Sequence, residues 1–221
     1  MKMIKRTTAA LIILIAAVAL ISGCSKSEEK TLTSDKKDGI SASNKGKKLT
    51  VSTSDSKLEW VGKKVTGQHN GTVDISNGEL FIDNGTLTGG SFDINFATIK
   101  VTDLQDPEMN AKLTGHLKSD DFFSAEKFPT GKFVLTSVTP LSNGTENNYS
   151  VGGNLTIKGI TKSVSFPAAV KLNGDAVTAT ADFKIDRTLW DVKFRSGKFY
   201  ENLGDKLIDD QIELKLNISA K

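Results

Sequence analysis

Alternation of apolar and polar residues, punctuated by Asn-Gly pairs, is the sequence feature that most restricts the fold. Asn-Gly dipeptides occur at 70–71, 77–78, 84–85, 143–144 and 173–174. This dipeptide is the strongest short-range signal for a tight hairpin turn. Apolar residues alternate with polar ones in runs such as 92–96 and 212–218, which gives a strand one dry and one wet face. The sequence therefore predicts antiparallel β-structure.

About nine strands are expected, at 57–65, 72–76, 79–82, 92–96, 132–139, 149–158, 163–172, 177–185 and 212–218. Such a chain either stacks two sheets as a sandwich or closes one sheet into a barrel. Long strands joined by short hairpins favour the all-β, antiparallel up-and-down barrel of the lipocalin type. A barrel of about eight strands is either filled by its own side chains or leaves room for one small ligand.

One short helix is expected to interrupt the strands. Asp106 suits the N-cap and Pro107 the first helical position, while Met109, Leu113 and Leu117 recur near helical spacing. The apolar segment 122–129 that follows either closes one end of the barrel or packs the helix against it.

The N-terminus carries a targeting signal. Lys2, Lys5 and Arg6 precede an apolar run that is shorter than the roughly 20 residues of a bilayer-spanning helix. The stretch from Leu20 to Cys24 resembles a bacterial lipobox. That resemblance implies a signal peptide over residues 1–23, cleavage before Cys24, and lipidation of Cys24 with diacylglycerol and an acyl chain such as palmitate.

The next segment is expected to be a flexible tether. Residues 24–48 are mostly Ser, Lys, Glu, Asp, Gly and Asn after the cysteine, a composition that buries too little apolar surface to fold. The folded domain is expected at 49–221. Ser25 stands where many Gram-negative lipoproteins carry an aspartate that retains them at the inner membrane. We therefore expect a lipid-anchored protein of the cell envelope, at the outer membrane, facing the periplasm or the cell surface.

Composition and motifs argue against several functional classes. The chain has 29 basic and 26 acidic residues, and the basic excess lies in the signal peptide, so no concentrated basic surface for nucleic acid is expected. Cys24 is the only cysteine, and His69 and His116 are the only histidines, without metal-ligand spacing. Neither Gly-x-Ser-x-Gly nor a Walker loop occurs. We expect no enzyme, no cofactor and no metal; the oligomeric state is left open.

Candidate ligand contacts lie on the expected dry face. Its apolar members either fill the barrel or line a ligand tunnel; they are Trp60, Phe81, Phe92, Phe96, Phe133, Phe166 and Phe183. Trp190 is added as a further apolar candidate. His69 is either a hydrogen-bonded structural residue or a cap for the polar head of a ligand. Arg187 either forms a structural bridge or meets a ligand carbonyl or phosphate.

Five local signatures occur in an order that resembles the YceI-like family. They lie at 58–71, 89–94, 116–129, 153–162 and 185–190. The resemblance implies a lipocalin-like barrel whose interior binds long isoprenoid chains, including isoprenoid quinones. Asp191 departs from the pattern, since a small residue, often glycine, is expected there, and this puts the local turn in doubt.

The combined expectation is a membrane-anchored, non-catalytic protein that sequesters or carries an isoprenoid amphiphile. Two alternatives stay open. One is an envelope lipoprotein with a filled barrel that acts through its outer face, and the other is an enzyme acting on lipid, whose catalytic pair would be visible only in space.

Overall fold

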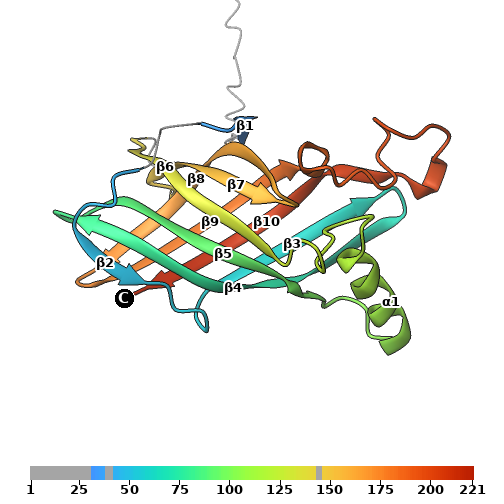
Figure 1. Cartoon of the computed structure of the whole chain (residues 1–221), viewed down its shortest axis with the longest axis horizontal. Coiled ribbons are helices and arrows are strands. Elements are labelled where there is room, and N and C mark those ends of the chain that lie inside the picture. The colour runs from blue at the N-terminus through green and yellow to red at the C-terminus, as the bar shows by residue number, and fades with distance from the viewer. Residues whose placement is uncertain (1–30, 38–41, 143–145) are drawn as a thin grey trace, which may run out of the picture.

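Eight antiparallel strands close into a barrel in the computed structural model, which describes residues 31–37, 42–142 and 146–221 (Figure 1). The barrel strands are β3 (Lys57–Lys64), β4 (Gly67–Asp83), β5 (Thr86–Val101), β6 (Thr130–Pro140), β7 (Tyr149–Ile157), β8 (Ile160–Asn173), β9 (Ala176–Asp186) and β10 (Ile208–Ala220). Each pairs with the next along the chain, and β10 returns to β3. The predicted up-and-down barrel is therefore confirmed, and the sandwich is excluded.

The predicted helix is also confirmed. Helix α1 (Pro107–Lys118) begins at Pro107, and the side chain of its N-cap residue Asp106 accepts a hydrogen bond from the Met109 backbone N–H at 2.9 Å. Two short 3₁₀ helices, η1 (Arg187–Trp190) and η2 (Gly204–Lys206), lie in the connection between β9 and β10. Figure 1 shows α1, this connection and the β3–β4 hairpin at the same end of the barrel.

One segment of the expected tether, and the boundary between tether and domain, form strands rather than free chain. Strand β1 (Leu32–Asp35) pairs with β8, and β2 (Lys47–Thr50) pairs with β4 beyond the end of β3. Composition gave no sign of β1 because its side chains are largely exposed and its contacts are main-chain hydrogen bonds at a sheet edge. The expected signal peptide, Cys24 and Ser25 lie outside the described residues.

Strand β1 lies in the barrel wall between the parts of β8 and β9 that do not pair with each other. In the described structure, β8 and β9 pair over Ala169–Asn173 and Ala176–Thr180, while the earlier part of β8 pairs with β1. The Thr31 hydroxyl accepts a hydrogen bond from the Lys184 backbone N–H at 3.2 Å on the β9 side. A hydrogen bond from Lys162 to Asp35, at 2.8 Å, lowers the pKa of that carboxyl. Every described strand lies between Leu32 and Ala220, so the body after Cys24 contains the whole barrel.

Two of the predicted Asn-Gly turns are wrong. The pairs at 70–71 and 77–78 lie inside β4, whereas those at 84–85 and 173–174 form the β4–β5 and β8–β9 turns, with φ of 72° at Gly85 and 59° at Gly174. The pair at 143–144 lies outside the described residues. Gly71 is needed for close packing instead, because a Cβ there would lie 1.8 Å from the Lys100 carbonyl oxygen and 2.6 Å from Cζ2 of Trp60.

We expect Gly71→Ala to lower the free energy of unfolding by about 2 kcal/mol, because the added methyl overpacks the β4–β5 contact. Gly115→Ala is the matched control, since an added Cβ at this exposed position on α1 meets nothing within 4 Å. It should stabilise the protein by up to about 1 kcal/mol through helix propensity. Urea unfolding followed by circular dichroism measures both, and equal effects of the two substitutions would contradict the packing argument.

The core has two parts. The larger cluster lies inside the barrel, and a second cluster at the α1 end combines Trp60, Ile99, Val101, Leu117, Phe122 and Val192. Among the helices in the described ranges, none is both long and apolar enough to cross a membrane.

Candidate ligand-binding cavity

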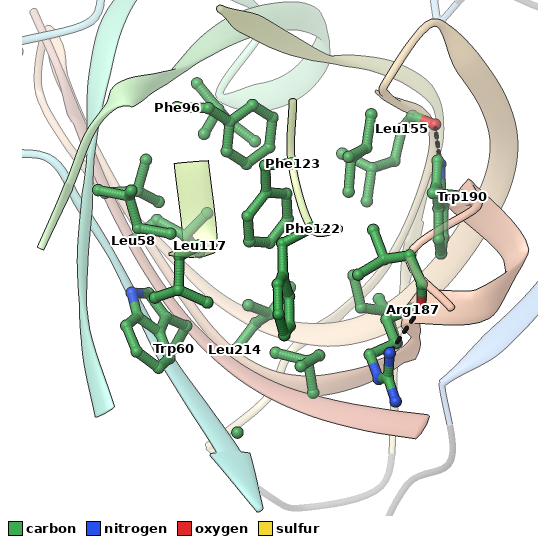
Figure 2. A pocket seen from close by; sticks show the side chains of 18 of the residues that line it. Leu58, Trp60, Phe96, Leu117, Phe122, Phe123, Leu155, Arg187, Trp190 and Leu214 are labelled. Atoms are coloured by element: carbon green, nitrogen blue, oxygen red, sulfur yellow. Dashed lines mark hydrogen bonds between the residues drawn. The ribbon is translucent and has the colours of Figure 1, made fainter. Parts of the chain in front are cut away.

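A cavity of about 150 Å³ lies inside the barrel and is lined almost wholly by apolar side chains (Figure 2). Its lining reaches the surface at the end of the β3–β4 hairpin, where Lys63, Lys64 and His69 lie. At roughly 10–15 Å³ for each water-sized position, this volume corresponds to on the order of ten such positions. The interior therefore has room for a slender apolar chain of a few isoprene units.

Nine of the ten residues predicted as ligand contacts line this cavity: Trp60, His69, Phe92, Phe96, Phe133, Phe166, Phe183, Arg187 and Trp190. The apolar members reach it because inward positions alternate along each strand, as the period-two pattern predicts.

Four phenylalanines form a ladder along one wall. Phe92, Phe133, Phe166 and Phe183 come from β5, β6, β8 and β9, and successive ring centroids lie 5.2, 5.9 and 4.0 Å apart. Strand β7 contributes Gly153 at this level. A Cβ on Gly153 would lie 2.1 Å from the Phe133 ring, so this glycine leaves the space through which Phe133 reaches Phe166. The β6–β7 register also has a bulge beside this glycine, because Leu135 is opposite Gly153 and Ser137 is opposite Gly152.

Phe81 is the predicted contact that does not line the cavity. In the register of β4 and β5, Ile75 is opposite Ile94 and Asn77 is opposite Asp93, so Ser76 is an extra, bulged residue. A one-residue bulge reverses which side chains point inward beyond it. Leu80 is consequently buried, and its neighbour Phe81 points to the other face and is only half-buried.

The segment after α1 covers part of the cavity. Leu117, Phe122 and Phe123 line it, and the Phe123 ring stacks on Phe96 with centroids 4.7 Å apart (Figure 2). These residues were not among the predicted contacts, although the apolar cluster at 122–129 was noted. The sequence left open whether this cluster closes the barrel or packs the helix. In the structure it does both, because Phe122 and Phe123 line the cavity and Phe122 packs in the same cluster as Leu117 of α1.

The two tryptophans of the lining differ in their hydrogen bonding. Trp190 is fully buried, and its indole N–H donates to the Leu155 carbonyl at 3.0 Å. The indole N–H of Trp60 is buried without a hydrogen-bond partner in the described part of the chain. Trp60 is opposite Gly71 in the β3–β4 register, two residues from the pair of Gly62 and His69. The unpaired donor therefore lies near the open end of the cavity.

Arg187 holds the connection between η1 and β10 together. Its guanidinium donates to the carbonyls of Val192 at 2.7 Å, Asp209 at 3.0 Å and Ile208 at 3.1 Å, and to the Asp210 carboxylate at 3.4 Å. Four of its five N–H groups are thus used, and the side chain is 3% exposed. Of the two roles considered from sequence, the contacts match the structural one.

The charges around Arg187 are balanced locally. Burial lowers the pKa of Arg187, and Asp210, Asp186 and Asp209 oppose that change. For Asp186, burial raises the pKa, but hydrogen bonds from Lys198 and from the hydroxyl and backbone N–H of Thr188 outweigh it, and the pKa falls below its ordinary value. This carboxylate also caps η1.

The histidines pair with aspartates. Nδ1 of His69 lies 2.8 Å from an Asp103 carboxylate oxygen, and the other oxygen accepts from the Asn70 backbone N–H at 3.0 Å. Burial raises the pKa of Asp103, yet the hydrogen bonds from Asn70 and His69 outweigh it and lower that pKa. An ionised carboxylate only accepts, so Nδ1 carries the hydrogen between the two groups, and Nε2 is the ring nitrogen left for a ligand at the cavity entrance.

His116 contributes nothing to the cavity lining. Its Nε2 lies 2.9 Å from the Asp121 carboxylate, and its ring packs edge-on against Phe122 and Phe194. Across residues 31–37, 42–142 and 146–221, no three His, Cys, Asp or Glu side chains form a group suited to a metal.

Comparison with known proteins decides the family. Residues 49–220 match the YceI-like domain. The chain belongs to the YceI-like family. A UPF0312 protein of Shewanella denitrificans is 34% identical over 92 residues, which are 42% of this chain and 44% of that protein. One from Photorhabdus laumondii is 36% identical over 77 residues, which are 35% and 37% of the two chains. The YceI-like chain thus spans less than half the length of these curated relatives.

Solved structures share the YceI-like fold. BcnA of Burkholderia cenocepacia superposes with a TM-score of 0.61 at 24% identity, over 77% of this chain and 99% of that one. A polyisoprenoid binding domain from Saccharophagus degradans gives 0.56 at 10% identity, over 78% and 97%. At such identities the likeness shows the fold alone.

The departure at Asp191 has a structural explanation. Asp191 ends η1 in the left-handed region, with φ 59° and ψ 26°, where glycine is favoured and aspartate is among the better tolerated alternatives. The turn that the YceI-like pattern assigns to a small residue therefore forms here with Asp191.

Proposed function

We propose that this chain is a non-catalytic binding protein that holds the apolar tail of an isoprenoid amphiphile in its barrel. The observation that carries the proposal is the apolar cavity whose lining reaches the surface among polar side chains. Burial of an apolar chain is worth about 25 cal/mol per Å², so the cavity favours a hydrocarbon tail over a polar solute. Family membership and the fold shared with a polyisoprenoid binding domain support the same cargo.

The opening suits a head group with oxygen atoms. His69 offers its ring Nε2 there, and Trp60 has an unpaired indole N–H nearby. A prenol hydroxyl both donates and accepts hydrogen bonds and so suits both groups, whereas a quinone carbonyl only accepts and so suits the Trp60 N–H. Arg187 is left out of this proposal because its donors are taken by carbonyls of its own chain.

The anchor belongs to the same proposal. We propose that Cys24 is lipidated after cleavage of residues 1–23 and holds the barrel at the outer membrane. Two or more acyl chains give a stable anchor where one gives only marginal binding.

Native mass spectrometry tests the binding function. Residues 25–221, expressed in a bacterial envelope compartment and purified without detergent, should carry one isoprenoid lipid per chain. Organic extraction and fragmentation then identify the released lipid. A folded sample that shows only the bare polypeptide mass, even after incubation with an isoprenoid quinone, would instead support the filled-barrel interaction protein.

A further inference from the structure

The cavity end of the barrel carries most of the exposed apolar side chains. Of seven large apolar residues that are exposed in the described ranges, six belong to the β3–β4 hairpin, to α1 and the segment after it, or to the β9–β10 connection. Figure 1 shows these elements at one end of the barrel. Val65, at the tip of the β3–β4 hairpin, is 62% exposed, and Phe199 and Tyr200, in the β9–β10 connection, are 50% and 49% exposed. Lys193 lies over the Phe199 ring, 5.0 Å from its centroid, yet both aromatic side chains stay about half exposed. A cluster of exposed apolar side chains marks an interaction surface.

These two segments are neighbours in space. Lys64 is opposite Ile208 in the β3–β10 register, and the Ile208 backbone N–H donates to the Arg195 carbonyl at 3.0 Å. Figure 1 shows the hairpin and the connection side by side at one end of the barrel. We call their exposed side chains the basic–aromatic rim, which comprises Lys64, Val65, Arg195, Lys198, Phe199 and Tyr200.

The rim is basic without carboxylates. Residues 63–68 and 192–200 together contain five lysines and arginines and no Asp or Glu. Three of the five pair with carboxylates outside these two ranges: Lys63 with Glu213, Lys193 with Asp191, and Lys198 with Asp186 and Asp210. Lys64 and Arg195 have no carboxylate partner in the described structure. Arg195 instead lies over the Phe194 ring, 4.9 Å from its centroid.

The opposite side of the opening has the reverse charge. Residues 103–128, which include α1, contain six acidic and three basic residues. The exposed Met109 of α1 lies on this acidic side. Because one side of the opening is basic and the other acidic, an anionic surface attracts the basic side and repels the acidic side.

We propose that the basic–aromatic rim docks the opening of the barrel onto an anionic phospholipid bilayer, with α1 facing away from it. Aromatic side chains favour the interface between headgroups and acyl chains, and basic side chains are attracted to anionic lipid. Because the cavity opens beside the rim, an apolar tail passes between bilayer and barrel with little exposure to water. The route for cargo rests on the proposed function, whereas the docking itself does not.

Vesicle sedimentation of residues 25–221, which lack the acyl anchor, tests the docking. Binding to phosphatidylcholine vesicles that contain phosphatidylglycerol should exceed binding to phosphatidylcholine alone by about tenfold. Arg195→Gln should weaken binding to the anionic vesicles by about fivefold. Phe199→Ser with Tyr200→Ser should weaken it at least as much. Raising the salt concentration should reduce the binding of the wild type.

Two control variants lie on the acidic side of the opening. Lys112→Gln and Met109→Ser remove an exposed basic and an exposed apolar side chain from α1, and both should bind vesicles as the wild type does. Equal loss in these controls, or equal binding to both vesicle types, would overturn the proposal. So would a dimer in light scattering that Phe199→Ser with Tyr200→Ser dissociates, because the rim would then contact a second copy.

Binding of an isoprenoid quinone in solution separates the two proposals. The rim variants Arg195→Gln and Phe199→Ser with Tyr200→Ser should bind quinone as tightly as the wild type. Vesicle docking by a protein that binds no quinone would refute the proposed function and leave docking intact. Quinone binding without vesicle docking would refute the docking and leave the proposed function intact.

Discussion

Arg187→Met should lower the free energy of unfolding by about 3–5 kcal/mol, the range found when one partner of a buried charged network is removed. Methionine fills much of the same space but supplies no donor. The carbonyls of Val192, Ile208 and Asp209 would then lose their partner, and Asp210 would keep only its ion pair with Lys198, at 3.6 Å. Chemical denaturation monitored by fluorescence and by circular dichroism measures the loss.

Lys171→Met is the matched control for this substitution. Lys171 is exposed on β8, and changes at such surface positions usually stay within about 0.5 kcal/mol. A loss below about 1 kcal/mol for Arg187→Met would show that the connection between η1 and β10 holds without the guanidinium. If the folded fraction of Arg187→Met bound quinone far more weakly than the wild type, the head-group role considered from the sequence would regain support.

Leu214→Trp should weaken the binding of a short-chain isoprenoid quinone by at least about 100-fold, equivalent to about 2.8 kcal/mol. Leu214 lines the cavity and lies between Trp60 of β3 and Phe183 of β9 in the register (Figure 2). An indole at this position occupies a large part of a cavity of about 150 Å³. Because the indole enters existing space, the fold should survive, with a cost of no more than about 1–3 kcal/mol.

The neighbouring residue supplies the control for Leu214→Trp. Lys215 follows Leu214 on β10, points to the outer face and is exposed, so Lys215→Trp adds the same indole outside the barrel. Isothermal titration with quinone should show the weakened affinity for Leu214→Trp and the wild-type affinity for Lys215→Trp. Equal affinities in both, with native circular dichroism, would place the ligand somewhere other than the cavity.

The barrel and its dry face could be predicted from sequence because both depend on local alternation. Ile94 and Phe96 on β5, and Leu216 and Ile218 on β10, are buried as their period-two spacing predicts. The capped helix could be predicted for the same reason, since Asp106 and its partner Met109 are close in the chain. Resemblance to the family then supplied the proposed cargo, which no local pattern contains.

The wrong predictions concern contacts between distant segments. Gly71 looks like a turn glycine but packs against Lys100 and Trp60. Phe81 looks like an inward-facing residue, but the bulge at Ser76 in the pairing with β5 turns it to the other face. Strand β1 resembles a linker in composition because an edge strand is held by its backbone. In each case the structure depends on a contact with a residue far along the chain or on a backbone hydrogen bond, and neither is visible in a local sequence pattern.

The bulge at Ser76 limits how β4 can change during evolution. Before it, Val73 and Ile75 point inward, and after it Leu80 does. The inward positions of β4 are therefore odd-numbered before Ser76 and even-numbered after it. Loss of a single residue elsewhere in this stretch would have to be absorbed at Ser76 or would turn Leu80 outward and Phe81 into the barrel. Relatives that lack the extra residue should therefore show a one-residue gap at this position, with the residue aligned with Leu80 still pointing inward.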